Sequence, residues 1–276
     1  MNTNAVLSDF AAYAVRPLSV PDAARGRARL VLQAALAGLF VALRSPERTR
    51  LIGPVVPGAT MPGGARVPGT SLELDPVQAT FSMATLIGGS GRGASHVAGL
   101  LAVSDWLARR ARMEGRTPPN VGDLLTLLVK CCEIDGAVEP LRNGPRVATA
   151  AVVSAMLGAN EAQVAGALAQ AWSESVPPPG SGGWAAADAL SRGVQLAFAG
   201  VRWGFTAAAV MPAHPLACRA MLDPAIDAEA CVRRFEAAVA GLFSPRQAAA
   251  IRALFAEPRQ LEQLAVNDFV AMFVVN

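Results

Sequence analysis

The sequence predicts an all-α, multi-helix protein, and three observations support this. Hydrophobic residues make up 53% of the 276 residues, and alanine supplies much of that content, while aromatic residues make up only 5%. Small side chains favour closely packed helices over a β-sandwich built on large strand residues. Helix-capping motifs recur along the chain, and the period-2 alternation typical of strands is nearly absent.

An apolar run and a capping signal mark the first helices. Residues 30–43 (LVLQAALAGLFVAL) are shorter than the roughly 20 apolar residues of a membrane span. They therefore predict a buried helix or a subunit-interface helix. Asp75 supplies an N-cap side chain and Pro76 the first helical position of a helix over residues 76–87, which a Gly-Gly pair closes.

Similar signals open helices in the second half of the chain. Asn160 and Gln163 form a capping-box pattern at the start of EAQVAGALAQAW. Within residues 231–243, apolar side chains recur at i, i+3, i+7, i+10 and i+11, the stripe of an amphipathic helix. Ser244, followed by a proline and then by Gln247, repeats the capping device before AAAIRALFAE.

Three stretches interrupt the helical pattern. Residues 53–70 are rich in Gly and Pro and predict an irregular loop. Residues 88–95 (GGSGRGAS) and 176–183 (VPPPGSGG) predict flexible turns between helices. Loops on a rigid helical scaffold often carry binding and catalytic residues, and as often they are plain connectors.

Charge and composition exclude several classes of function. The net charge is +3 with scattered arginines and a single lysine, Lys130, so we expect no nucleic-acid partner. The chain offers no membrane span and no secretory signal pattern, so we expect a cytoplasmic protein with no membrane partner. The cysteine spacing matches no zinc site, so we expect buried thiols, no metal and no cofactor. The four cysteines are Cys131, Cys132, Cys218 and Cys231.

Segments in six parts of the chain share an ordered pattern with a known family. Residues 184–197 (WAAADALSRGVQLA) are similar to a Trp-Ala-Ala-Gly-Asp-Ala motif followed by Ser-Arg, and residues 127–138 (LLVKCCEIDGAV) to a helix with a Tyr-Glu-Ile-Gln-Gly pattern. The other similar segments are residues 75–87, 97–118, 146–172 and 231–275. Together they resemble the 2-methylcitrate dehydratase (MmgE/PrpD) family over most of the chain, and the resemblance implies that family's helical domain.

The resemblance also bears on domain organisation. Members of the family have a helical domain interrupted by a smaller α+β lid, and their last helices return to the helical domain. Here Trp203-Gly204-Phe205 looks like the segment just before the lid, and only about 25 residues separate it from the returning helices. The resemblance therefore implies one helical domain over residues 1–276, with the lid deleted around residues 206–224. Residues 225–276 would return to that domain.

The family's lyase chemistry removes a proton next to a carboxylate and expels hydroxide or carbon dioxide. Such chemistry needs acidic, basic and cationic groups near the substrate. In this sequence an Asp-rich run has become GGSGRGAS, a His stretch is deleted, and the family's His falls near Arg92. The family's Lys falls on Gly182 and its Tyr on Cys132. We therefore do not expect an active 2-methylcitrate dehydratase.

Several other residues are candidates for a repurposed site. The catalytic candidates are His96, Glu133 and Cys132. His96 follows the lost His by one turn and titrates in a useful range, although a structural role at a helix start would equally explain it. Cys132 and Glu133 would form a nucleophile or acid–base pair, but adjacent helical residues point about 100° apart. The candidates for substrate binding are Arg92, Thr85 and Trp184, with Arg92 suited to a carboxylate.

Two functions from different classes remain open. The first is a lyase- or isomerase-type enzyme with altered chemistry on a small organic substrate, carboxylic acids included. The second is a non-catalytic scaffold or partner subunit. In either case the resemblance implies a homodimer or a hetero-oligomer with a relative. A closed pocket with His96 and Glu133 pointing inward favours the enzyme, and a filled core with these side chains in solvent favours the scaffold.

Overall fold

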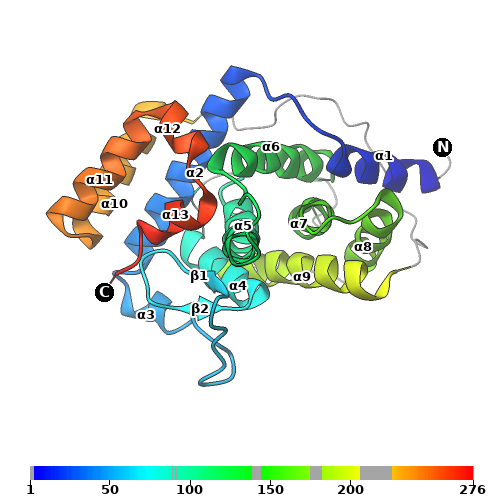
Figure 1. The fold of residues 1–276 in the computed structure, drawn as a ribbon. Coiled ribbons are helices and arrows are strands. Elements are labelled where there is room, and N and C mark those ends of the chain that lie inside the picture. Colours follow the sequence, from blue (N-terminus) through cyan, green and yellow to red (C-terminus); the bar gives the residue numbers. More distant parts are fainter. Residues whose placement is uncertain are drawn as a thin grey trace.

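The structure is a computed structural model that describes residues 3–88, 90, 93–138, 144–174, 182–205 and 226–275. Helices dominate these residues, and their two strands form one short hairpin (Figure 1). The prediction of an all-α, multi-helix fold is therefore confirmed. In the same residues, no helix has the length and apolar character needed to cross a bilayer.

The first half of the described chain contains six helices and the hairpin. The elements are α1 (Thr3–Val15), α2 (Asp22–Ala42), α3 (Pro46–Thr49), β1 (Ala65–Arg66), β2 (Glu73–Leu74), α4 (Pro76–Ile87), α5 (His96–Met113) and α6 (Val121–Val138). The second half is helical. Its elements are α7 (Gly144–Met156), α8 (Glu161–Ser173), α9 (Gly182–Trp203), α10 (Ala228–Leu242), α11 (Pro245–Ala256), α12 (Pro258–Gln263) and α13 (Val266–Ala271).

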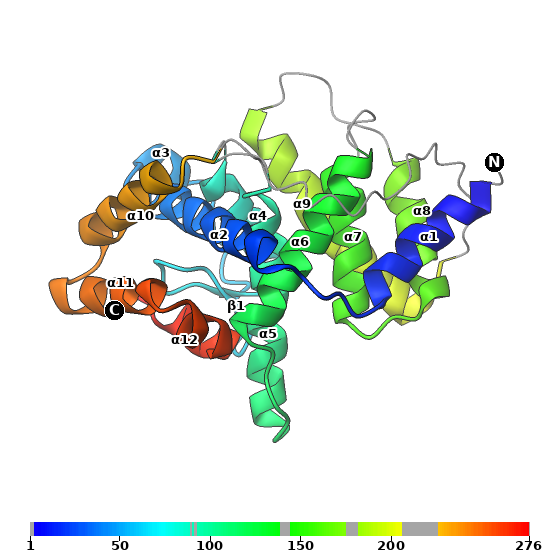
Figure 2. The same cartoon turned by 90° about the horizontal axis from the view of Figure 1, so that it is seen from above.

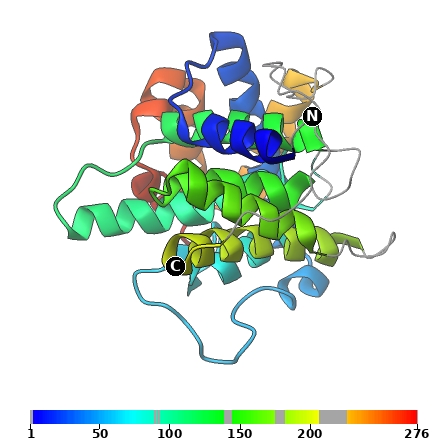
Figure 3. The ribbon, with the colours of Figure 1, turned by 90° about the vertical axis from the view of Figure 1, so that its right-hand side faces the viewer.

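Helix α5 is the central element. Figure 1 views it nearly end-on, with α6 above it and α4 below, and Figure 2 shows the same body from above. Residues 96–105 are buried without interruption, as expected for a helix surrounded on all sides. Helix α5 packs against α4, α6, α7, α9 and α13. Figure 3 shows α1 lying over α7 and α8, with α9 beneath them.

The C-terminal helices pack onto the N-terminal half of the chain. Helix α10 lies along α2, α13 contacts α5, and α12 contacts α6 (Figure 1). Aromatic rings fill this junction: the ring of Phe40 lies 5.0 Å from that of Phe243 and 5.4 Å from that of Phe273. The proposed lid deletion concerns residues 206–224, of which the structure describes none, so that part of the domain prediction stays a prediction.

The β-hairpin corrects one loop prediction. Residues 53–70 were expected to be irregular throughout, but Ala65 pairs with Leu74 and Arg66 with Glu73 in an antiparallel ladder. Asp105 of α5 explains the order there, because its buried carboxylate accepts hydrogen bonds from the backbone N–H and the guanidinium of Arg66. The turn predicted over residues 176–183 lies almost wholly outside the described residues.

The predicted helix starts are confirmed by their capping contacts. The carboxylate of Asp75 accepts hydrogen bonds from the backbone N–H groups of Val77 and Gln78. Asn160 and Gln163 form the complete capping box at α8. The Ser244 hydroxyl accepts the N–H of Gln247 at α11. These local contacts fix where the helices begin and hence which residues face the core.

Candidate functional site

The start of α5 places His96 in the interior. Gly93 has φ +82°, a conformation that favours glycine, and its carbonyl accepts the N–H of His96 at 3.2 Å as the helix begins. The His96 side chain is 1% exposed. The helix therefore opens with a buried imidazole rather than with a solvent-exposed polar cap.

The imidazole of His96 pairs with α6. Its Nε2 atom lies 3.0 Å from Oδ2 of Asp135, and Nδ1 has no hydrogen-bond partner among the described residues. Burial lowers the pKa of His96, but interactions with Cys131 and Asp135 outweigh it and raise the pKa from 6.5 to about 10. Cys131 and Asp135 are four residues apart and so share one face of α6. At neutral pH the ring is an imidazolium held against a carboxylate.

Asp135 is also fixed from its other side. A Cβ added at Gly144 would lie 2.0 Å from Oδ1 of Asp135, so a larger residue here would displace the carboxylate from its present position. Gly144 is the first residue of α7, and a helix N-terminus favours nearby negative charge. The start of α7 therefore helps to hold the carboxylate against His96.

Cys132 lies behind the turn that precedes α5. A Cβ added at Gly93 would lie 2.8 Å from its Sγ and 3.8 Å from Val31 of α2. Burial raises the pKa of the Cys132 thiol well above its usual value, with Cys131 and Asp135 adding to the effect. The thiol therefore stays protonated at neutral pH, whereas a nucleophilic cysteine needs a stabilised thiolate. This environment weakens the proposed nucleophilic role.

Glu133 lies away from His96. Residues two apart on an α-helix point about 160° apart, so Glu133 faces away from both Cys131 and Asp135. Its side chain is 7% exposed and has no hydrogen-bond or ion-pair partner among the described residues. Burial raises its pKa from 4.5 to about 7. The structure thus joins His96 to Asp135 and not to Glu133.

The proposed substrate-binding residues do not converge either. The hydroxyl of Thr85 is buried and donates to the carbonyl of Phe81 within α4 at 2.9 Å. Trp184 is 56% exposed, and its ring meets that of Phe81 edge-on at 6.1 Å. Arg92 lies outside the described residues. Thr85 and Trp184 thus both contact Phe81, Thr85 at the Phe81 backbone carbonyl and Trp184 at the Phe81 ring, and neither hydrogen-bonds to His96.

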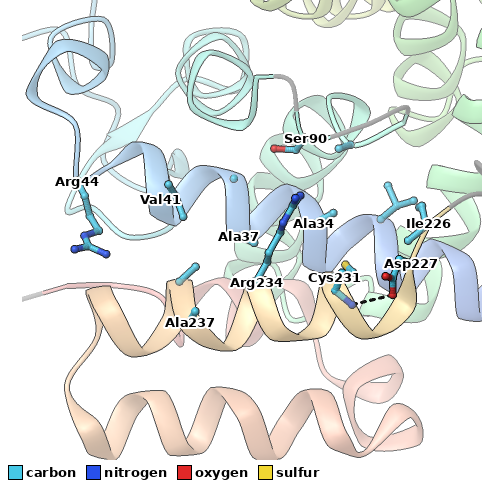
Figure 4. Close-up of a pocket in the computed structure, with 15 residues that line it drawn as sticks. Ala34, Ala37, Val41, Arg44, Ser90, Ile226, Asp227, Cys231, Arg234 and Ala237 are labelled. Carbon is cyan, nitrogen blue, oxygen red and sulfur yellow. Dashed lines mark hydrogen bonds between the residues drawn. The ribbon is translucent and has the colours of Figure 1, made fainter.

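A cavity of about 650 Å³ lies beside the turn, between α2 and α10 (Figure 4). Its polar lining groups are Arg44, Ser90, Asp227 and Arg234. Val31 and Ala94 connect it to the turn before α5, but His96, Cys132 and Glu133 do not line it. The pocket was therefore missed at the sequence level. The available signal was the spacing of small residues on α2 and α10, which places them on one face of each helix.

Metal binding has no support in this region. No group of three or more His, Cys, Asp or Glu side chains that could hold a metal ion occurs within the described ranges. What the geometry offers is an acid–base pair, His96 and Asp135, and a separate cavity with two arginines at its wall.

Comparison with known proteins identifies the class. Residues 6–216 match the MmgE/PrpD N-terminal domain, and the chain belongs to this family. It is 35% identical to the 2-methylcitrate dehydratase of Escherichia coli (strain K12) over 187 residues, which cover 56% of this chain and 38% of that enzyme. It is 34% identical to the Cupriavidus necator 2-methylcitrate dehydratase over 223 residues, which cover 70% of this chain and 46% of that enzyme. It is 33% identical to an alkylcitrate dehydratase of a fungal species over 189 residues, which cover 56% of this chain and 38% of that enzyme.

These matches cover less than half of each relative, so they establish the family of this chain but not its activity. The chain spans between 38% and 46% of the length of these three relatives. The family and the helical fold are therefore established, whereas the activity, substrates and partners of the whole relatives are matters for proposal.

Proposed function

We propose that this chain is a divergent MmgE/PrpD-family enzyme of lyase or isomerase type. Its substrate is a small organic molecule, with carboxylic acids as the leading candidates, and it is not an active 2-methylcitrate dehydratase. Relatives named for 2-methylcitrate and alkylcitrate dehydration support the carboxylic class. The loss of the family's His, Lys and Tyr at Arg92, Gly182 and Cys132 argues against the parental reaction.

The observation that carries the proposal is the His96–Asp135 pair. Asp135 orients the ring through Nε2, and Nδ1 is the ring atom that a substrate would reach once the neighbouring Cys131 side chain moves away from the imidazole. A protonated His96 would donate a hydrogen bond to the substrate carboxylate and so stabilise the negative charge that develops there when a water molecule entering with the substrate takes the proton from the neighbouring carbon. Because His96 is 1% exposed, a substrate reaches Nδ1 only when the surrounding side chains rearrange.

A second candidate is a non-catalytic scaffold or partner subunit, alone as a homodimer or together with a full-length relative. The observation that favours it is that none of His96, Cys132 and Glu133 lines the cavity, although all three are less than 8% exposed and so do not lie in solvent as the scaffold was expected to have them. A histidine paired with an aspartate in a core is also a common structural arrangement. Turnover decides between the two candidates.

The test is a thermal-shift and mass-spectrometric screen of the purified chain with His96→Gln and Asp135→Asn alongside. The panel contains citrate, 2-methylcitrate, cis-aconitate, apolar carboxylic acids and lactones. The enzyme proposal expects turnover of at least one compound that both folded variants lose. If no compound is converted, the scaffold becomes the better account, and a pull-down for a partner chain follows.

A further inference from the structure

We infer that the cavity between α2 and α10 is a binding site for a small organic carboxylate with an apolar body, anchored on Arg234. The site is separate from the His96–Asp135 pair. It is therefore a second site, and the inference does not rest on the proposed function. The binding itself would also be present in a scaffold.

Small side chains on the facing sides of α2 and α10 leave the space that forms the cavity. The facing surfaces consist of Ala34, Ala37 and Gly38 on α2 and Ala230, Ala237 and Ala238 on α10. The missing side-chain volume leaves about 650 Å³, within the range of about 300–1,000 Å³ usual for small-molecule sites. Val31, Val41 and Ile226 make the rest of the wall largely apolar.

The cavity wall carries more positive than negative side chains, which favours an anionic ligand. The one acidic lining residue, Asp227, uses its Oδ1 to cap α10 by accepting the N–H of Ala230 at 3.0 Å. The guanidinium groups of Arg44 and Arg234 have no hydrogen-bond or ion-pair partner in the part of the chain that the structure describes. A planar guanidinium binds a carboxylate through two parallel hydrogen bonds.

Arg234 is the better placed of the two arginines. It rises from the middle of α10 toward α2 across the cavity, whereas Arg44 lies at the far end of α2 (Figure 4). A Cβ added at Gly241 would lie 2.9 Å from Nη1 of Arg44, so that guanidinium sits at the C-terminal end of α10, where the helix dipole already favours a cation. Arg234 is free for a ligand, and it lies close enough to Cys231 to lower the pKa of that buried thiol, which burial raises.

The apolar wall sets the chemical class. It buries a short alkyl or cyclic body but offers few donors for additional hydroxyl or carboxyl groups. Burying such groups without partners would cost free energy. The cavity therefore suits a monocarboxylate with several carbons and disfavours citrate.

The test measures binding apart from turnover. Octanoate, hexanoate, hexan-1-ol and citrate are titrated into the full chain, with affinity followed by ligand-observed NMR. Protection of Cys231, whose Sγ lies at the cavity, against iodoacetamide is read by mass spectrometry. Arg234→Gln is compared with Arg233→Gln, which changes a neighbouring arginine that pairs with Glu229 on the surface. Ala237→Phe, which fills part of the cavity, is compared with Ala240→Phe, which is likewise exposed on α10 but does not line the cavity.

We expect octanoate and hexanoate to bind and to protect Cys231, with hexan-1-ol and citrate weaker. Arg234→Gln should weaken carboxylate binding about tenfold or more, and Arg233→Gln should leave it within about twofold. Ala237→Phe should abolish protection, and Ala240→Phe should not. Equal binding of hexan-1-ol and hexanoate, equal effects of the two arginine variants, or no binding would overturn the inference. Binding without turnover would leave the inference intact, because the enzyme proposal is tested separately by the screen with His96→Gln and Asp135→Asn.

Discussion

The Nε2 atom of His96 lies 3.0 Å from Oδ2 of Asp135, which joins the first residue of α5 to the last turns of α6 inside the core. The contact brings together residues 39 positions apart. Gly144, at the start of α7, packs against the other carboxylate oxygen of Asp135. Three helices of the family's N-terminal domain thus meet at one charged pair, and this gives the pair consequences for stability as well as for chemistry.

The stability contributed by His96 should depend on pH. Its folded-state pKa of about 10 lies above the ordinary 6.5, so the folded state holds the proton more tightly than the unfolded state. The contribution is therefore fully present below pH 6.5 and is lost as the pH rises through 10. We expect His96→Gln to cost about 3 kcal/mol at pH 6 and much less at pH 10, measured by chemical denaturation.

The matched control for this experiment is His214→Gln, which changes the other histidine of the chain. It should not reproduce the pH-dependent difference. A loss of stability in His96→Gln that is the same at pH 6 and pH 10 would show that the pairing with Asp135 does not raise the pKa.

Glu133→Gln should stabilise the protein at high pH. Burial raises the pKa of Glu133 from 4.5 to about 7, so the folded state disfavours the charged form. The stability lost through this group grows as the pH rises from 4.5 through 7. The variant should gain about 1 kcal/mol at pH 8 and almost nothing near pH 4.5. Glu236→Gln, on an exposed position of α10, should change little at either pH, and a destabilised Glu133→Gln would argue for an unseen partner.

The ion pair between Arg66 and Asp105 should matter far more than surface pairs. Asp105 is 0% exposed and binds Arg66 through both carboxylate oxygens, which ties the hairpin to α5. Asp105→Asn leaves the part-buried guanidinium of Arg66 without its counter-charge and should cost about 3 kcal/mol in equilibrium unfolding. Glu229→Gln, in an exposed pair with Arg233, should cost less than about 0.5 kcal/mol. An equal loss of unfolding free energy in Asp105→Asn and Glu229→Gln would show that the Arg66–Asp105 pair contributes no more than a surface pair.

Lys130 should anchor the end of α1. Its Nζ donates hydrogen bonds to the carbonyls of Ala14 at 2.7 Å and Arg16 at 2.6 Å, where α1 ends. Lys130→Met removes both bonds, so amide exchange in residues 3–15 should accelerate about tenfold or more, while exchange in α7 should change little. Hydrogen–deuterium exchange with mass spectrometry measures this. Lys130→Arg should restore part of the protection, and unchanged exchange in α1 would contradict the anchoring role.

Features set by neighbouring residues were predictable from the sequence. The caps at Asp75, Asn160 and Ser244 formed as expected, because an N-cap depends only on the next three residues. The short hairpin was not expected, since its order comes from Asp105 some 40 residues later in the chain. The all-α class was predictable for a similar reason, since it rests on local capping motifs and helical periodicity repeated along the chain.

The candidate site was only partly predictable. The sequence singled out His96, but it grouped this residue with Glu133 and Cys132 rather than with Asp135. Helical periodicity places Glu133 on the opposite face of α6, and the pairing partner of His96 depends on how α5 crosses α6, which no local pattern encodes. The cavity joins helices some 200 residues apart, so Arg234 resembled any other surface arginine.

The most direct test of the central claim is deuterium incorporation. The chain is incubated in D₂O with the carboxylic acids of the screen, and NMR follows exchange of the hydrogens next to the carboxylate in wild type and in His96→Gln. An enzyme that stabilises charge through His96 should incorporate deuterium well above the rate without protein, and folded His96→Gln should lose this by about a hundredfold or more. No incorporation in wild type, or equal incorporation in the variant, would contradict a catalytic His96–Asp135 pair.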